Sequence, residues 1–111
     1  MKKDNEVYLR HMLEISQQIK TEFENRGRAA IESDQLAMEG LVRLIQKIGE
    51  AARHVSVDFR IKHSDVPWTE IIGMRDRVVH DYMRVQVPIV WKTVEKDIPK
   101  LIQILEKLIQ D

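Results

Sequence analysis

The sequence contains no cysteine, so disulfides and cysteine-ligated metal sites are excluded. Glycine and proline are also scarce, at four and three residues in 111, and no low-complexity linker is visible. No apolar run approaches the roughly 18 residues needed to span a bilayer. The opening MKKDNEVYLRH lacks the apolar core of a secretory signal. We therefore expect a cytoplasmic protein with no membrane segment.

The charge balance is the next constraint on function. Eighteen basic residues are matched by eighteen acidic ones. Proteins that coat nucleic acids non-specifically depend on many phosphate contacts, so a neutral chain argues against that class. The balance still allows a small site that contacts one or two phosphates. The length predicts a single domain, residues 1–111, with one modest core.

Apolar residues recur at three- and four-residue spacing almost throughout, which predicts helices rather than strands. The predicted helices cover about residues 4–24, 34–55 and 67–82, followed by a short helix from Pro88 and a last helix that Asp97 and Pro99 start. Residues 55–66 are expected to form a loop, and Gly27 to break the helical pattern. Gly49 lies at the edge of a buried face, where a neighbouring backbone could come close. The expected fold class is all-α, an antiparallel four-helix bundle with an additional short helix.

The stretch GMRDRVVHDY contains an arginine, a histidine and a tyrosine in the spacing R-x4-H-x-Y, namely Arg75, His80 and Tyr82. On a continuous helix, which advances about 100° per residue, Arg75 falls inside the apolar arc that must face the core. A charged side chain there is costly without a partner. We expect either a carboxylate or bound anion that compensates Arg75, or a long side chain that reaches a cleft.

His80 falls about 140° away from Arg75 on the same straight helix, so their side chains would not converge. Three arrangements could bring them together: a helix distorted near His80, an Arg75 side chain that bends round the helix, or a second subunit. A twofold interface would bring two copies of the motif face to face, and we predict a homodimer. On the residues alone, a structural explanation stays equally open, with Arg75 salt-bridged, His80 on the surface and Tyr82 in the core.

Three stretches together resemble one family. The sequences IGEAARHVS, VPWTEIIGMRDRVVHDY and VWKTVEKDIPKL occur in the order and spacing of the HepT-like branch of HEPN domains. The family pattern of arginine, polar residue and then His-x-Tyr falls on Arg75, Asp76, His80 and Tyr82. The resemblance covers the chain from about residue 34 onward. It implies a HEPN-like helical bundle that acts as the toxin of a type VII HEPN/nucleotidyltransferase toxin–antitoxin system.

The implied activity is metal-independent endoribonuclease cleavage with no cofactor, in which the 2′-hydroxyl of the RNA substrate is the nucleophile. His80 would transfer protons, because histidine titrates near neutral pH. Arg75 would bind phosphate oxygens and stabilise the developing charge. Asparagine is common in the family where this chain has Asp76, whose carboxylate can pair with Arg75. The four histidines have no helical partner histidine, so we expect no metal site.

The resemblance also implies a partner, a minimal nucleotidyltransferase antitoxin that would adenylylate Tyr82 and inhibit the toxin. The main alternative is a non-catalytic nucleotide- or substrate-binding subunit of a nucleotidyltransferase complex, and a purely structural dimer is a third. Further basic residues are candidates for RNA contact, although solvation explains them equally well: Arg43, Lys47, Arg53, Arg77 and Arg84.

Overall fold

The structure, a computed structural model, describes residues 3–81 and 84–109. In chain order the elements are α1 (Lys3–Glu32), α2 (Gln35–His54), α3 (Val57–Lys62), α4 (Trp68–Ile72), α5 (Met74–Val78), β1 (Val79–Asp81), β2 (Arg84–Val85), α6 (Val87–Lys92), the π-helical turn η1 (Thr93–Asp97) and α7 (Ile98–Ile109). The predicted all-α class is confirmed, with one very short β-hairpin added. Within the described ranges, no helix combines the length and the apolar character needed to cross a membrane.

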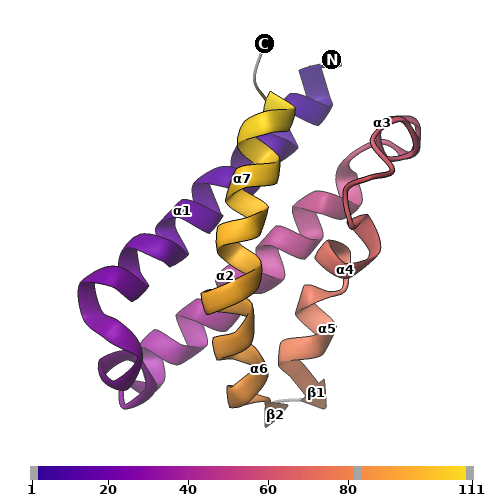
Figure 1. Cartoon of the computed structure of the whole chain (residues 1–111). Helices are drawn as coiled ribbons and strands as arrows, with labels where there is room; N and C mark the ends of the chain where they lie inside the picture. The colour runs from indigo at the N-terminus through magenta and orange to yellow at the C-terminus, as the bar shows by residue number, and fades with distance from the viewer. Residues whose placement is uncertain (1–2, 82–83, 110–111) are drawn as a thin grey trace.

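The helices form an antiparallel bundle (Figure 1). Helices α1, α2, the α4–α5 segment and the α6–η1–α7 segment alternate in direction, and both ends of the chain lie at the same end of the bundle. Helix α1 packs on both α2 and α7, while α4 and α5 pack on α2. The buried core is drawn from all four segments: Leu9, Met12, Ile15, Ile19, Ile45, Ile48, Ala52, Trp68, Ile71, Val90, Trp91, Ile98, Leu101 and Leu105. The helical spacing of apolar residues that the sequence shows is therefore reflected in the buried faces of α1, α2 and α7.

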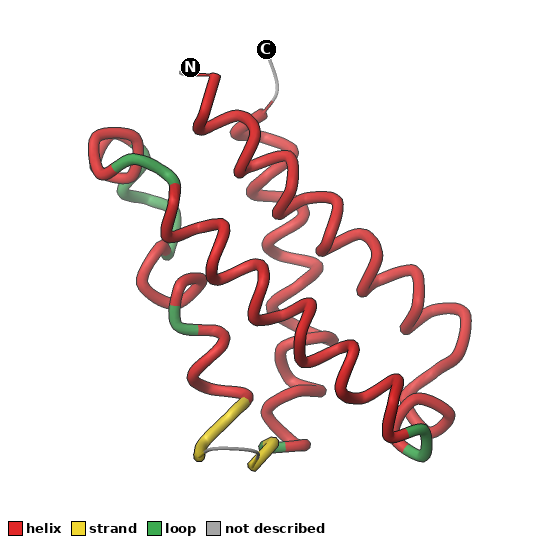
Figure 2. The backbone as a smooth tube through the Cα atoms, turned by 180° about the vertical axis from the view of Figure 1, so that it is seen from behind, coloured by secondary structure: helices red, strands yellow, loops and turns green. Residues whose placement is uncertain are grey.

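The break predicted at Gly27 is present as a bend, but the predicted end of the first helix near residue 24 is wrong, because α1 continues to Glu32. Gly27 has φ 80° and ψ 162°, a conformation that only glycine adopts without strain. The backbone tube in Figure 2 shows how α1 turns at this end of the molecule before it enters α2.

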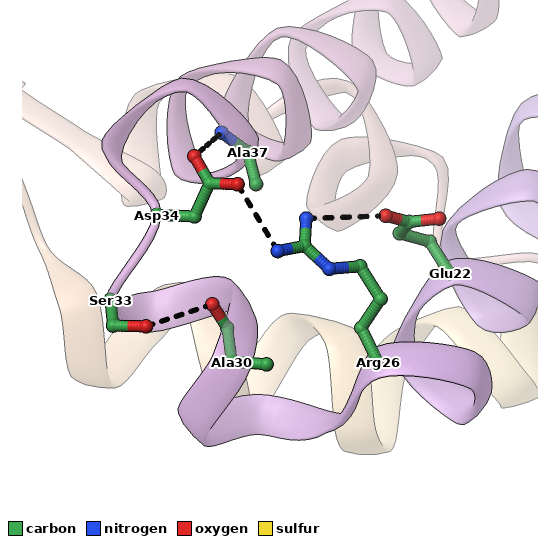
Figure 3. Close-up of polar contacts among 6 residues, drawn as sticks. All are labelled: Glu22, Arg26, Ala30, Ser33, Asp34 and Ala37. Atoms are coloured by element: carbon green, nitrogen blue, oxygen red, sulfur yellow. Dashed lines mark hydrogen bonds and ion pairs between the residues drawn. The ribbon is translucent and has the colours of Figure 1, made fainter.

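Asp34 is the N-cap of α2 (Figure 3). One carboxylate oxygen accepts a hydrogen bond from the Ala37 N–H at 3.1 Å, and the other accepts from Arg26 Nη2 at 3.1 Å. Arg26 belongs to α1, and its Nη1 atom also lies 3.6 Å from Glu22 Oε2, one turn earlier on the same helix. The Ala37 N–H lowers the pKa of Asp34 below its ordinary value, and Arg26 lowers it further. The cap thus fixes the start of α2, and its contact with Arg26 ties that start to α1.

The prediction of a loop at residues 55–66 is wrong in part, because helix α3 lies within this segment. Ser56 caps α3 by accepting from the Phe59 N–H at 3.2 Å. The side chain of Asn5 ties this cap to α1, since it accepts from the Ser56 N–H at 2.9 Å and donates to Ser56 Oγ at 3.1 Å. Helix α3 has six residues and buries only Phe59, so it has no apolar stripe that periodicity could detect.

The prediction of a single helix at about residues 67–82 is also wrong. Gly73 separates α4 from α5, and the helix ends at Val78 rather than Tyr82. The chain then enters β1, where Val79 pairs with Val85 of β2. Branched valine side chains favour extended backbone, and the antiparallel partner strand completes the hydrogen bonding. Tertiary pairing therefore overrides the helical spacing of the apolar residues.

The prediction that a separate last helix starts at Asp97 and Pro99 is wrong as well. Helix α6 continues through η1 into α7 without a break. The Ile98 N–H donates to the Thr93 carbonyl, five residues earlier, which makes the turn wider than an α-helical one. The wide turn directly precedes Pro99, whose missing N–H and bulky ring disfavour a regular α-helical ladder. The segment from residue 87 to residue 109 consequently acts as one long wall of the bundle.

The close approach predicted at Gly49 is confirmed. A Cβ placed on Gly49 would lie 2.8 Å from the carbonyl oxygen of Ile72 and 3.4 Å from that of Ile71. Only a glycine lets the end of α4 come this close to α2. Because α5 follows α4 directly, this contact also sets where α5 lies along α2.

Candidate functional site

An open cleft of about 1000 Å³ lies at the end of the bundle where the α1–α2 turn, the β-hairpin and the start of α6 come together. This is the lower end of the molecule in Figure 1. Helices α2 and α5 supply its charged walls, and three valines of the hairpin and α6 add an apolar part. The lining residues are Glu32, Ser33, Gln35, Met38, Glu39, Val42, Arg43, Gln46, Arg75, Asp76, Val79, Val85 and Val87.

Arg75 lies in this cleft and not in the core, so its predicted place in a core-facing arc is wrong. Its side chain is 56% exposed. Helix α5 buries Met74 and Val78, and Arg75 falls on its open side. Of the two alternatives from the sequence, the long side chain that reaches a cleft is confirmed.

Asp76 lies beside Arg75 in the same cleft. Its Oδ1 atom is 3.9 Å from Arg75 Nη1, at the outer limit of an ion pair. Both side chains are well exposed, and an exposed pair of this kind contributes about 0–1 kcal/mol. The pairing expected from the sequence is present, but it is loose enough for a stronger anionic partner to replace Asp76 at the Arg75 guanidinium.

The backbone of His80 belongs to β1, directly after the last residue of α5. Of the three arrangements considered from the sequence, a helix that changes course before His80 is the one observed for the backbone. The 140° separation computed for a straight helix therefore does not apply. Val79 and Val85, paired across the hairpin, line the cleft that holds Arg75. Tyr82, the predicted modification site, lies outside the described residues.

Arg43 is a second arginine in the cleft, on α2 rather than α5. From the sequence, Arg43 is one of five basic residues that are candidates for RNA contact. Solvation of a charged surface explains these five residues equally well. Of the others, Lys47, Arg53 and Arg77 are not among the lining residues. The local sequence around Arg43 carries no motif, because the cleft is formed by segments that are distant in the chain.

Three carboxylates share the cleft with these two arginines. They belong to Glu32, Glu39 and Asp76. Glu32 also accepts a hydrogen bond from the indole N–H of Trp91, so its position is fixed by the core. Carboxylates outnumber guanidinium groups among the described lining residues, so these residues do not create a strongly positive field. A phosphate would be held there by direct contacts with individual arginines and not by long-range attraction.

The comparisons with known proteins agree with the resemblance noted in the sequence. The family described as "Ribonuclease HepT-like" matches residues 12–108. A relative from Caldanaerobacter subterraneus named "Putative RNase" is 35% identical over 103 residues, which cover 93% of this chain and 92% of the relative. A Thermococcus cleftensis protein named "Probable ribonuclease HepT" is 40% identical over 75 residues, 68% of each chain.

A longer relative comes from Methanocaldococcus jannaschii and is named "Gamma-glutamylcyclotransferase and putative RNase". It is 32% identical over 111 residues, which are 100% of this chain and 50% of the relative. The chain thus spans half the length of that protein. No solved structure matches the chain. The family match covers nearly the whole fold described above, and this chain belongs to the HepT-like ribonuclease family.

Proposed function

We propose that this protein is a metal-independent endoribonuclease, the toxin of a type VII HEPN/nucleotidyltransferase toxin–antitoxin system. The observation that carries the proposal is the position of Arg75. It is an exposed cation in an open cleft, on the short helix that leads directly into the strand containing His80. Membership of the HepT-like ribonuclease family supports RNA as the substrate.

The reaction begins with attack by the 2′-hydroxyl oxygen of RNA on the adjacent phosphorus. His80 takes the hydroxyl proton, while the bond from phosphorus to the 5′-oxygen breaks and that oxygen receives a proton. The products carry a 2′,3′-cyclic phosphate and a 5′-hydroxyl. Arg75 donates hydrogen bonds to the phosphate oxygens, whose negative charge increases in the transition state. Histidine suits this proton transfer because it titrates near neutral pH.

A homodimer would complete the site. Two protomers related by a twofold axis would bring two copies of the R-x4-H-x-Y motif together, so that one His80 acts as base and the other as acid. Sedimentation at micromolar concentration tests this part of the proposal, and a strictly monomeric protein would count against it.

Tyr82 is the proposed site of inhibition. A minimal nucleotidyltransferase antitoxin would transfer AMP from ATP to the Tyr82 hydroxyl and release pyrophosphate. The added phosphate would supply negative charge close in sequence to Arg75 and compete with RNA. Intact-mass and peptide mapping of protein co-expressed with its transferase tests the assignment. A modification mapped to another residue would overturn it.

Cleavage of a defined RNA in the presence of EDTA is the main test of the activity. We expect wild type to cleave, and both Arg75→Ala and His80→Ala to lose most of the activity. Arg53→Ala is the matched control, because Arg53 is an exposed arginine outside the cleft. A requirement for added magnesium would refute the mechanism, and wild-type protein that cleaves no RNA would refute the function.

The second candidate is a non-catalytic subunit that holds a nucleotide or substrate for a nucleotidyltransferase. The carboxylates in the cleft and the pairing of Asp76 with Arg75 favour it, since both oppose a strongly phosphate-binding site. Modification of Tyr82 in a protein that binds nucleotides but cleaves no RNA would support this alternative.

A further inference from the structure

Among the described lining residues, the cleft contains two arginines on different helices, and the proposed reaction uses only one of them. Arg75 comes from α5, and Arg43 comes from the middle of α2. Both side chains are 56% exposed, so both guanidinium groups are accessible to a ligand. Gln46, one helical turn after Arg43, also lines the cleft and can donate or accept hydrogen bonds.

The partner of Arg43 in the free protein lies outside the cleft. Arg43 Nη1 donates to Glu50 Oε2 at 3.2 Å, and Glu50 is not among the lining residues. Both members of this pair are about half exposed, so the pair is screened by water and costs little to break. The Arg43 guanidinium can therefore exchange the Glu50 carboxylate for a phosphate without leaving a buried charge unpaired.

The cleft also has room for more than one nucleotide. Its volume of about 1000 Å³ is at the upper end of the range for small-ligand sites, roughly 300–1,000 Å³. A single phosphate at Arg75 would leave the α2 wall unused. The α2 wall carries Arg43 in the same open cleft as Arg75, so a neighbouring phosphate has a cation available there.

We propose that Arg43 binds a second phosphate of the RNA, next to the phosphodiester held by Arg75. Single-stranded RNA with at least two consecutive phosphodiesters is then bound more tightly by the cleft than RNA with one. This inference rests on the proposed function and adds a length preference to it. Arg43 acts as a binding residue: it strengthens RNA binding, and it does not take part in the bond-breaking step.

The test compares Arg43→Ala with Lys47→Ala on short RNAs. Lys47 is an exposed cation one turn further along α2 that does not line the cleft, so its variant loses the same charge from the same helix. For a tetranucleotide with three phosphodiesters, we expect Arg43→Ala to raise KM about tenfold and to leave kcat nearly unchanged. Lys47→Ala should change KM less than twofold. For a dinucleotide with one phosphodiester, Arg43→Ala should equal wild type.

A binding measurement separates this inference from the proposed function. Fluorescence anisotropy with a 2′-O-methyl tetranucleotide, which cannot be cleaved, should show weaker binding by Arg43→Ala. The slope of log affinity against log salt should fall by about 0.7, the value for one phosphate contact to a single strand. Arg43→Lys, which keeps the charge without the planar fork, should fall between the alanine variant and wild type.

Each outcome has a definite meaning. Cleavage by wild type with no length-dependent effect of Arg43→Ala overturns the inference and leaves the function standing. Binding that depends on Arg43 without any cleavage overturns the ribonuclease function and supports a second phosphate site. An equal loss on both RNA lengths overturns the inference, and circular dichroism of the variant shows whether that loss reflects misfolding.

Discussion

Two glycines of α2 give a sharp test of the packing that positions the candidate site. Gly49 faces the end of α4, and a Cβ there would lie 2.8 Å from the Ile72 carbonyl oxygen. Gly40 lies on the same helix, and a Cβ there would have nothing within 4 Å. The substitutions Gly49→Ala and Gly40→Ala therefore add the same methyl group to the same helix. Only the methyl group at position 49 contacts the backbone of α4.

The magnitudes follow from this difference. Alanine is more favourable than glycine inside a helix by about 0.8–1.0 kcal/mol, and both variants gain this term. At Gly49 the obstacle is a backbone oxygen that cannot rotate away, and overpacking of this kind costs about 1–3 kcal/mol. We expect Gly40→Ala to raise the free energy of unfolding by about 1 kcal/mol. The Gly49→Ala variant should be less stable than Gly40→Ala by about 1–3 kcal/mol.

Thermal and urea unfolding followed by circular dichroism measure both variants. For a chain of this length, each kcal/mol corresponds to roughly 4 °C in Tm, so the two variants should differ by about 4–12 °C. Gly49→Ala should also lower RNA cleavage, because displacement of α4 moves α5 and Arg75 with it. Equal stabilisation by the two substitutions would refute the close contact between α2 and α4, and with it the argument for how Arg75 is positioned.

Three further predictions concern other parts of the chain. The lowered pKa of Asp34 means that its cap stabilises the fold above about pH 3.8 and is lost as the pH falls through the lower, folded-state value. Asp34→Ala should therefore lower Tm at pH 7 and show a smaller further drop at acid pH than wild type; identical acid profiles would contradict the cap. Asp76→Asn removes the carboxylate that pairs with Arg75, so RNA cleavage should rise about two- to fivefold, and a lower rate would mean that the Asp76 charge assists the reaction. Asn5 is 4% exposed and makes two hydrogen bonds to Ser56, so Asn5→Ala should lower the free energy of unfolding by about 1–3 kcal/mol in urea melts, and an unchanged value would refute this tie.

The long elements of the fold could be predicted because their information is local. The apolar residues Met12, Ile15 and Ile19 of α1, for example, lie within a few turns of chain. Gly49 could be singled out because a glycine at the edge of an apolar face has few other roles. Short elements could not be predicted, because they contain too few residues for a periodic pattern. Helix α3, for example, has six residues and one buried side chain.

The candidate site could be predicted only in part. The motif points to Arg75, but its expected position in a core-facing arc is wrong, because the side chain is 56% exposed and lines the cleft. The helix ends where Val79 pairs with Val85 of the partner strand, and this pairing partner cannot be read from the local preference of valine for extended backbone. Arg43 enters the cleft because α2 packs beside α5, and that is a property of the assembled bundle.

The hydrogen bond between Trp91 and Glu32 gives this protein an internal optical signal. Trp91 is 1% exposed in the core, yet its indole donates to a carboxylate that lines the cleft. The other tryptophan, Trp68, donates instead to the backbone carbonyl of His63 at 3.0 Å. Neither Trp68 nor His63 lines the cleft. In a Trp68→Phe variant, the remaining emission would come from one indole bonded to the cleft wall. Ligands that disturb Glu32 could then be followed in real time without any attached dye.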